Sequence, residues 1–121
     1  MKSLRWMTVV LLLLVVTLPV PVFAKATAIA RPLVVDVRTE PEWNEGLLEG
    51  AILIPYDKIG EGIVKAAPDK KTKIHLYCRS GRRSGIALDV LKKLGYEDVT
   101  NNGSVKDAAE MLKIPVVKDP K

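Results

Sequence analysis

The segment Tyr77–Ser84, YCRSGRRS, constrains this chain more than any other. It contains the only cysteine, Cys78, and it follows an apolar run at residues 74–77. An amphipathic run at residues 86–94 comes after it. This order predicts a strand, a tight loop and a helix, with the loop at the carboxyl end of a parallel strand, where α/β sheets bind their ligands. The chain of 121 residues leaves room for one such globular domain.

The composition of the loop predicts an anion site around a reactive thiol. Backbone N–H groups that converge before a helix attract anions, and nearby arginines add positive charge. A thiol in such a place is favoured as the thiolate, so we expect Cys78 to be a catalytic nucleophile at neutral pH. The residues expected to bind its anionic substrate are Arg79, Ser80, Gly81, Arg82 and Arg83.

Two other interpretations of the loop are weaker. A lone cysteine is often a small buried apolar residue, but that role does not explain the Arg-Ser-Gly-Arg-Arg that follows Cys78. A phosphate-binding P-loop would end in Gly-Lys-Ser/Thr, and this loop does not.

The first residues have the layout of a secretory signal peptide. Lys2 and Arg5 precede an apolar run at residues 8–18, and prolines and small residues follow it. We expect cleavage after residues 1–24, which leaves a mature domain at residues 25–121. An uncleaved membrane anchor is less well supported, because the apolar run is shorter than the ~20 residues of a spanning helix. No stable membrane association is therefore expected after processing.

Charge and cysteine content narrow the function further. Processing removes two of the basic residues and no acid, so the formal charge falls from +5 to +3. Mild basicity without long Lys/Arg runs does not favour nucleic-acid binding, and a local anion site accounts for the charge better. A single cysteine in an exported protein is either an intermolecular link or a free reactive thiol, and the loop favours the reactive thiol.

The remaining pattern alternates short strands with helices. Leu33–Val37 is β-branched and predicts a buried parallel strand, and Pro41 and its neighbouring acids predict a helix start. Gly95 ends the helix that follows the cysteine loop. We expect further strands at 51–54, 73–78 and 97–101, helices at 57–67, 84–94 (starting at Ser84 or Gly85) and 105–112, and a turn at 102–104.

Asp36 and Arg38 stand at the carboxyl end of the first strand, where both could reach the cysteine loop. We expect them to support the loop. A buried carboxylate needs an opposite charge, so we expect Asp36 to pair with one of the loop arginines. Arg83 is expected to point back toward Asp36 or the backbone. Trp43 is expected to fill core space under the sheet edge.

His75 and Ser104 are not expected to take part in catalysis. His75 lies three residues before Cys78 on one strand, so the two side chains should point to opposite faces, about 10 Å apart. One histidine and one cysteine also cannot supply the four ligands of a metal site, so no metal is expected. Ser104 is expected to cap the last helix.

These motifs together resemble a single-domain rhodanese. The resemblance rests on Asp36-Val37-Arg38, Glu42-Trp43, the sequence GAILIP at residues 50–55, CRSGRRS at residues 78–84, Gly95-Tyr96, and Asn102-Gly103-Ser104, and it spans essentially all of the mature chain. With the export signal, the chain is most similar to the small periplasmic members. The departures are Gly46-Leu47-Leu48 before the Gly-Ala turn and Gly103-Ser104 in place of a double glycine.

The resemblance implies a fold, a reaction and a location. The fold would be an α/β three-layer sandwich around a parallel, roughly five-stranded sheet. The activity would be transfer of sulfur from thiosulfate to cyanide or a thiol through a persulfide on Cys78, by a ping-pong mechanism and without a metal or organic cofactor. We expect a periplasmic monomer.

Two alternatives from other classes are weighed against this expectation. The loops of cysteine phosphatases and arsenate reductases have a cysteine, five further residues and then an arginine. The residue at that arginine position here is Ser84, so the loop is smaller and this class of enzyme is not expected. A non-catalytic persulfide carrier or thiol-redox partner would use the same loop and stays open.

Overall fold

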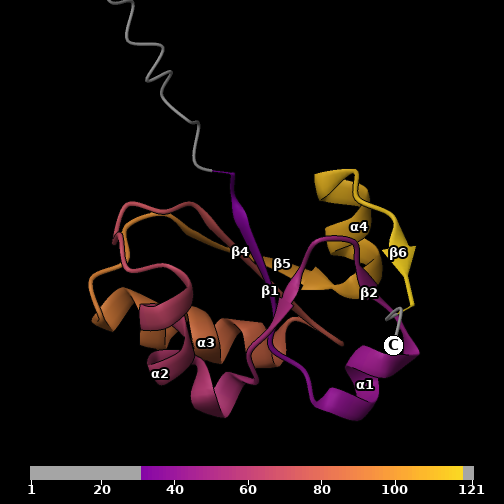
Figure 1. The fold of residues 1–121 in the computed structure, drawn as a ribbon, viewed down its shortest axis with the longest axis horizontal. Helices are drawn as coiled ribbons and strands as arrows, with labels where there is room; N and C mark the ends of the chain where they lie inside the picture. Colours follow the sequence, from indigo (N-terminus) through magenta and orange to yellow (C-terminus); the bar gives the residue numbers. More distant parts are fainter. Residues whose placement is uncertain (1–30, 119–121) are drawn as a thin grey trace, which may run out of the picture.

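The computed structural model describes residues 31–118, and the expected signal peptide lies outside this range. A four-stranded sheet forms the centre of the molecule (Figure 1). Its strand order is β3-β1-β4-β5, and every pairing is parallel. The α/β class is confirmed, although the sheet has four strands where about five were expected. The strands are β1 (Leu33–Asp36), β3 (Ile52–Leu53), β4 (Ile74–Cys78) and β5 (Val99–Ser104).

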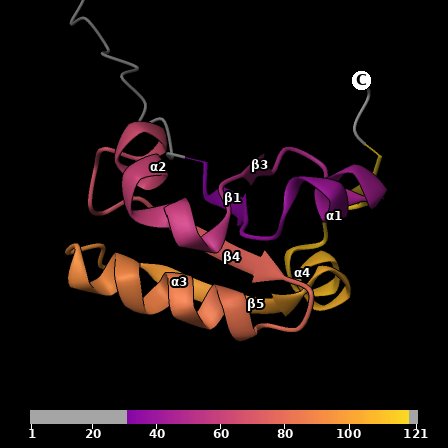
Figure 2. The same cartoon turned by 90° about the horizontal axis from the view of Figure 1, so that it is seen from below.

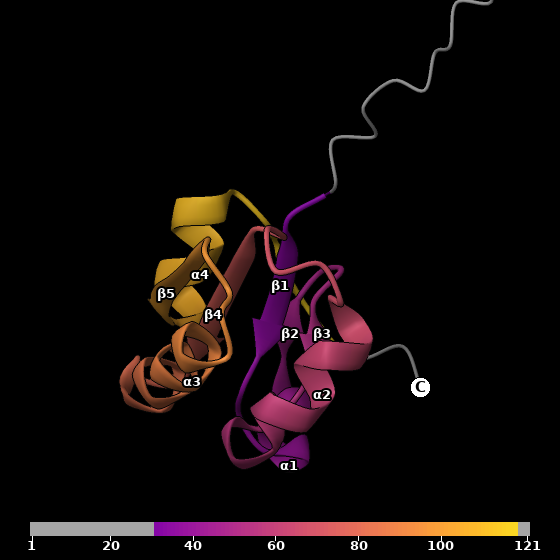
Figure 3. The ribbon, with the colours of Figure 1, turned by 90° about the vertical axis from the view of Figure 1, so that its left-hand side faces the viewer.

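The central strand β4 is buried along its whole length, as expected for a parallel strand covered on both faces. It pairs with β1 so that Asp36 lies opposite Tyr77. β1 and β4 lie side by side in the middle of the molecule (Figure 3). Because the strands are parallel, Asp36 and Cys78 come to the same edge of the sheet.

Helices cover both faces of the sheet. One core cluster includes Val35, Leu76 and Leu91 and joins the sheet to α2 and α3. The other includes Val34, Tyr77 and Ala108 and joins the opposite face to α4. The helical segments are α1 (Glu40–Glu45), the 3-10 turn η1 (Tyr56–Lys58), α2 (Ile59–Ala66), α3 (Arg82–Lys93) and α4 (Val105–Leu112). Among residues 31–118, no helix combines the length and apolar character needed to cross a membrane.

A small antiparallel pair, β2 (Leu47–Leu48) with β6 (Val116–Val117), was not expected from the sequence. Each strand has two residues, too few to show any alternation of apolar and polar side chains. Leu48 is fully buried in the core cluster under α4, so this departure from the family pattern fills space in the core.

Two element boundaries near the cysteine differ from expectation. Helix α3 begins at Arg82, because Gly81 adopts φ +93° and takes the N-cap position. Strand β5 runs on to Ser104, where a turn was expected at 102–104. The register against β4 slips there, and Gly103 has φ +80°, which is typical of a β-bulge beside a functional site.

Two side-chain expectations had different outcomes. Trp43 is only partly buried, so the expectation that it fills the core is wrong. Ser104 caps α4 as expected: its Oγ accepts a hydrogen bond from the Asp107 N–H at 3.0 Å.

Candidate active site

Cys78 is the last residue of β4. Figure 2 shows the chain leaving β4 and turning into α3. The residue is completely buried. Its Sγ accepts a hydrogen bond from the Gly81 N–H at 2.9 Å and lies 3.5 Å from Ser84 Oγ. The loop curls back on the sulfur, as the sequence predicted, and only residues 79–81 separate the strand from the helix.

The loop stabilises the thiolate form of Cys78. Burial alone raises the pKa of the thiol. Hydrogen bonds from the Ser84 hydroxyl and from the N–H groups of Ser84, Ser80 and Gly81 outweigh burial, so the pKa lies below its ordinary value. From the sequence we expected the arginines to contribute much of this lowering of the Cys78 pKa, whereas in the structure these hydrogen bonds are its main cause.

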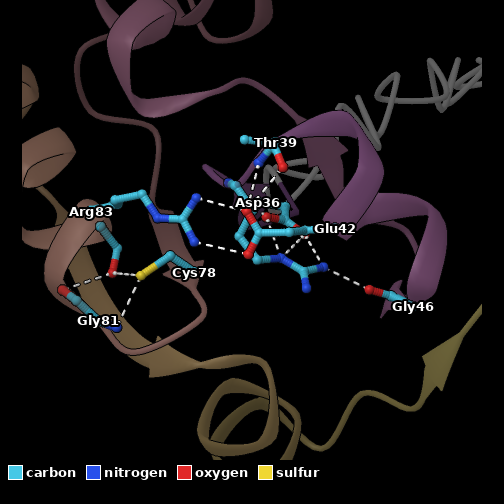
Figure 4. A network of polar contacts seen from close by, with 9 residues as sticks. Asp36, Thr39, Glu42, Gly46, Cys78, Gly81 and Arg83 are labelled. Atoms are coloured by element: carbon cyan, nitrogen blue, oxygen red, sulfur yellow. Dashed lines mark hydrogen bonds and ion pairs between the residues drawn. The ribbon is translucent and has the colours of Figure 1, made fainter.

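The three arginines of the loop have different surroundings. Arg79 and Arg82 are exposed, and Arg83 is partly buried. Figure 4 shows the Arg83 side chain extending from the cysteine loop to Glu42, where Nη1 and Nη2 donate to the two carboxylate oxygens at 2.8 and 2.9 Å. The expectation that Arg83 would turn toward Asp36 or the backbone is therefore wrong.

Glu42 lies in α1 and is a site residue that the sequence argument used only as a family marker and a helix-start acid. The Arg83 guanidinium lowers the pKa of Glu42 to about 2. Arg83 is thus largely neutralised by its partner, and Arg79 and Arg82 are the loop arginines whose side chains are open to solvent. A clue was available, because the helix that contains Glu42 directly follows β1 and so begins at the carboxyl edge of the sheet, where the cysteine loop also lies.

Asp36 pairs with Arg38, and not with a loop arginine as expected. Arg38 Nε donates to both carboxylate oxygens at 3.0 Å, and its Nη2 donates to Oδ2 at 2.7 Å and to the Gly46 carbonyl at 2.6 Å. Both residues are buried. The Arg38 guanidinium also lies over the ring of Tyr77 at 5.8 Å, so the pair meets the strand residue that precedes Cys78. We therefore expect the Asp36–Arg38 pair to support the cysteine loop through the contact of Arg38 with Tyr77 in β4.

Asn101 in β5 makes three hydrogen bonds beside the cysteine. Its Oδ1 accepts from Ser84 Oγ at 2.6 Å and from the Gly103 N–H at 3.0 Å, and its Nδ2 donates to the Gly81 carbonyl at 2.9 Å. The sequence argument placed Asn101 in the last strand and gave it no part in the site. Only the pairing of β5 with β4 brings it there.

His75 lies on the other face of β4, as strand alternation predicted. His75 and Tyr77 are two residues apart on the strand, so their side chains share a face. Tyr77 belongs to the core cluster under α4, whereas Cys78 belongs to the cluster under α2 and α3. The His75 Nδ1 lies 3.1 Å from Asn102 Oδ1. Among residues 31–118, no group of three or more His, Cys, Asp or Glu side chains could hold a metal ion.

The family model for the rhodanese-like domain matches residues 23–107. The chain belongs to the rhodanese-like family. It is 38% identical over 99 residues to the thiosulfate sulfurtransferase PspE of Escherichia coli K12, covering 82% of this chain and 89% of that protein. It is also 33% identical over 94 residues to a putative mitochondrial thiosulfate sulfurtransferase of Schizosaccharomyces pombe, covering 67% of this chain and 66% of that one.

Solved structures agree with the family assignment. A "rhodanese with anions" from E. coli is 38% identical and superposes with a TM-score of 0.67, covering 73% of this chain and 99% of that chain. Protein hp1203 of Helicobacter pylori is 33% identical, with a TM-score of 0.59 over 72% of this chain and 78% of that chain. The rhodanese fold and the sulfurtransferase class expected from the sequence are confirmed, and sulfur transfer is the general chemistry of this chain.

Proposed function

We propose that this rhodanese takes the outer sulfur of thiosulfate onto Cys78 and passes it to cyanide or a thiol. The observation that carries the proposal is the surroundings of the Cys78 sulfur: Sγ accepts the Gly81 N–H at 2.9 Å beside the N-terminus of α3, and its pKa is lowered. The names of the E. coli and S. pombe relatives, both thiosulfate sulfurtransferases, support the choice of donor.

In the first step the Cys78 thiolate attacks the outer sulfur of thiosulfate. A sulfur–sulfur bond forms to Cys78, the sulfur–sulfur bond of thiosulfate breaks, and sulfite leaves with its electron pair. Arg79 and Arg82 are exposed at the loop and can hold the sulfonate oxygens. Arg83 is engaged by Glu42, so we assign it to holding α3 against α1 at the edge of the site, with a weaker part in binding the anion.

In the second step the acceptor attacks the outer sulfur of the persulfide. Cyanide forms a carbon–sulfur bond and leaves as thiocyanate, and the electron pair of the broken bond returns to Cys78 as the thiolate. The persulfide sulfur carries negative charge, and backbone N–H groups at Ser80 and Gly81 can stabilise it. No redox partner is needed, because the oxidation level of the sulfur is carried from the donor to the acceptor.

Intact-mass measurement tests the first step. The purified protein should gain one sulfur atom after incubation with thiosulfate and lose it after cyanide is added, and a Cys78→Ala variant should gain none. Thiocyanate formed at steady state then separates an enzyme from a carrier. Sustained turnover that depends on Cys78 supports the proposal, whereas single loading without turnover supports a persulfide carrier, and no loading from thiosulfate overturns the proposed donor.

We also propose that residues 1–24 direct export and are removed, so that the periplasm is the working compartment of a monomeric domain. The basic start and the apolar run of this segment support export. The test is the mass of the protein recovered from a periplasmic fraction. A mass that begins near Lys25 is expected, and an unprocessed chain in the membrane fraction would contradict the proposal.

A further inference from the structure

Asn101 occupies a position where three separate parts of the site meet. It joins the hydroxyl of Ser84 in α3, the carbonyl of Gly81 in the cysteine loop and the N–H of Gly103 in the β5 bulge. The orientation of its amide is fixed, because Nδ2 faces an acceptor, the Gly81 carbonyl, while Oδ1 faces a backbone donor, the Gly103 N–H.

The backbone around Asn101 is closely packed, most tightly where Gly81 approaches Gly103. A Cβ atom on Gly81 would meet the Gly103 Cα at 3.3 Å, and a Cβ on Gly85 would lie 3.5 Å from Asn101 Nδ2. Gly81 and Gly103 also have positive φ angles of +93° and +80°. The bulge in β5 and the start of α3 are therefore fitted to one another, with the Asn101 amide between them.

The residues that Asn101 holds, Gly81 and Ser84, are also the residues that contact the sulfur. Gly81 donates its N–H to Cys78 Sγ at 2.9 Å, while its carbonyl accepts from Asn101. Ser84 Oγ lies 3.5 Å from Sγ, but its shortest contact is with Asn101 Oδ1 at 2.6 Å. The hydrogen bonds of Asn101 go to Ser84, Gly81 and Gly103 and not to the sulfur, yet they hold a side-chain donor and a backbone donor within reach of it.

We propose that Asn101 is a positioning residue for sulfur transfer, which aligns the Ser84 hydroxyl and the Gly81 peptide on the sulfur of Cys78. When the sulfur is a thiol, the single Ser84 proton can remain on the short contact to Asn101 Oδ1, and the thiol proton can point to Ser84 Oγ. When the sulfur carries negative charge, the Ser84 hydroxyl can turn its proton to Sγ, since a charged acceptor forms the stronger hydrogen bond. In that second arrangement Ser84 no longer donates to Asn101, and Asn101 holds the loop through its Nδ2 bond to the Gly81 carbonyl and its Oδ1 bond from the Gly103 N–H.

The chain provides a matched control in the next residue. Asn102 is buried, whereas Asn101 is partly buried, and the Asn102 side chain also has a polar partner, His75 on the other face of β4. Substituting Asn102 removes a buried amide from the same strand and does not touch the groups that contact Cys78. A general loss of stability should therefore be similar in Asn101→Ala and Asn102→Ala.

The experiment measures alkylation of Cys78 by iodoacetamide across a range of pH. Asn101→Ala releases the Gly81 carbonyl, and loss of the aligned Gly81 N–H bond to the charged sulfur predicts that the midpoint moves up by about one pH unit, or about tenfold less thiolate at neutral pH. Asn101→Asp fits the same space, loses the donor to Gly81 and adds a negative charge, so it should move the midpoint further up. Asn102→Ala should leave the midpoint unchanged.

The proposal is overturned if Asn101→Ala and Asn101→Asp keep the midpoint of the unchanged protein, or if Asn102→Ala moves it as far. If Asn101→Ala does not fold, Asn101→Asp decides by the same readout. The proposal rests on the proposed function for its consequence, a slower gain of sulfur from thiosulfate by the Asn101 variants. Alkylation needs no sulfur donor, so an unchanged protein that alkylates at low pH but gains no sulfur would contradict the proposed function and leave the alignment by Asn101 standing.

Discussion

Substitution of Asp36 by alanine should destabilise the fold by about 3–5 kcal/mol, because it leaves a buried guanidinium without its partner. The Asp36 side chain is 0% exposed and that of Arg38 is 7% exposed. The carboxylate accepts the Nε and Nη2 donors of Arg38 as well as the Arg38 backbone N–H at 2.9 Å. Burial alone would lower the pKa of Arg38, but Asp36 raises it, so the guanidinium stays charged in the unchanged protein.

A double-mutant cycle separates the interaction free energy between Asp36 and Arg38 from the cost of leaving one of the two charges buried without a partner. Arg38→Met leaves the Asp36 carboxylate buried alone and should cost a similar amount to Asp36→Ala. The double variant removes both charges and should cost clearly less than the sum of the single variants, with a coupling of about 2 kcal/mol or more. The Gly46 carbonyl loses a donor in both Arg38 variants, so that loss cancels in the cycle.

Urea unfolding followed by circular dichroism gives the free energies. Domains of this size are stable by about 5–15 kcal/mol, so the single variants should be studied at low temperature, where a large loss can still be measured. Single substitutions that each cost less than about 1 kcal/mol, or a double variant whose cost equals the sum of the two, would show that this buried pair is not coupled as its geometry indicates.

Two other predictions concern contacts that hold the same edge of the sheet. Arg83 lowers the pKa of Glu42 from 4.5 to about 2, so the stability that this pair provides is complete above pH 4.5 and is lost as the pH falls toward 2. Glu42→Gln should therefore cost about 1 kcal/mol at pH 7, the scale of a partly exposed pair, and the difference should shrink at pH 3, with exposed Glu40→Gln as the control in urea unfolding. Tyr77→Phe removes the acceptor of the buried Leu48 N–H, which lies 3.0 Å from the Tyr77 hydroxyl, and should cost about 1–3 kcal/mol by thermal unfolding, while a loss under about 0.5 kcal/mol would contradict the argument.

The fold was largely predictable because its signals are local. Strand β1 and helix α4 start at the residues that the sequence indicated, since an apolar run and a serine cap are visible within a few positions. β2 and β6 escaped prediction because each is two residues long and exists only through the other, more than 60 residues away along the chain. The early start of α3 depends on the positive φ of Gly81, which the glycine permits but does not require.

The reactive residue of the site was predictable, and its partners were not. Cys78 stands between a strand and a helix in the sequence itself. The choice of Arg83 between Asp36 and Glu42 depends on where α1 packs, and Glu42 is 41 residues from Arg83. The ion-pair partner of Asp36 is Arg38, which is only two residues away and folds back past the intervening residue. We expected Asp36 to pair with an arginine of the cysteine loop, and the arginine two residues away was not considered as its partner.

Two kinds of interaction surround the Cys78 sulfur: hydrogen bonds to the sulfur itself and the charges of exposed arginines. The thiolate is stabilised mainly by hydrogen bonds from Ser84 and the loop N–H groups to a buried sulfur, where salt screens the interaction weakly. The exposed Arg79 and Arg82 lie outside that set, and charges in their position act over a longer range and are screened by salt. We therefore expect substitution of Arg79 or Arg82 to leave the low pKa of Cys78 in place, because the hydrogen bonds to its sulfur come from Ser84 and the loop N–H groups.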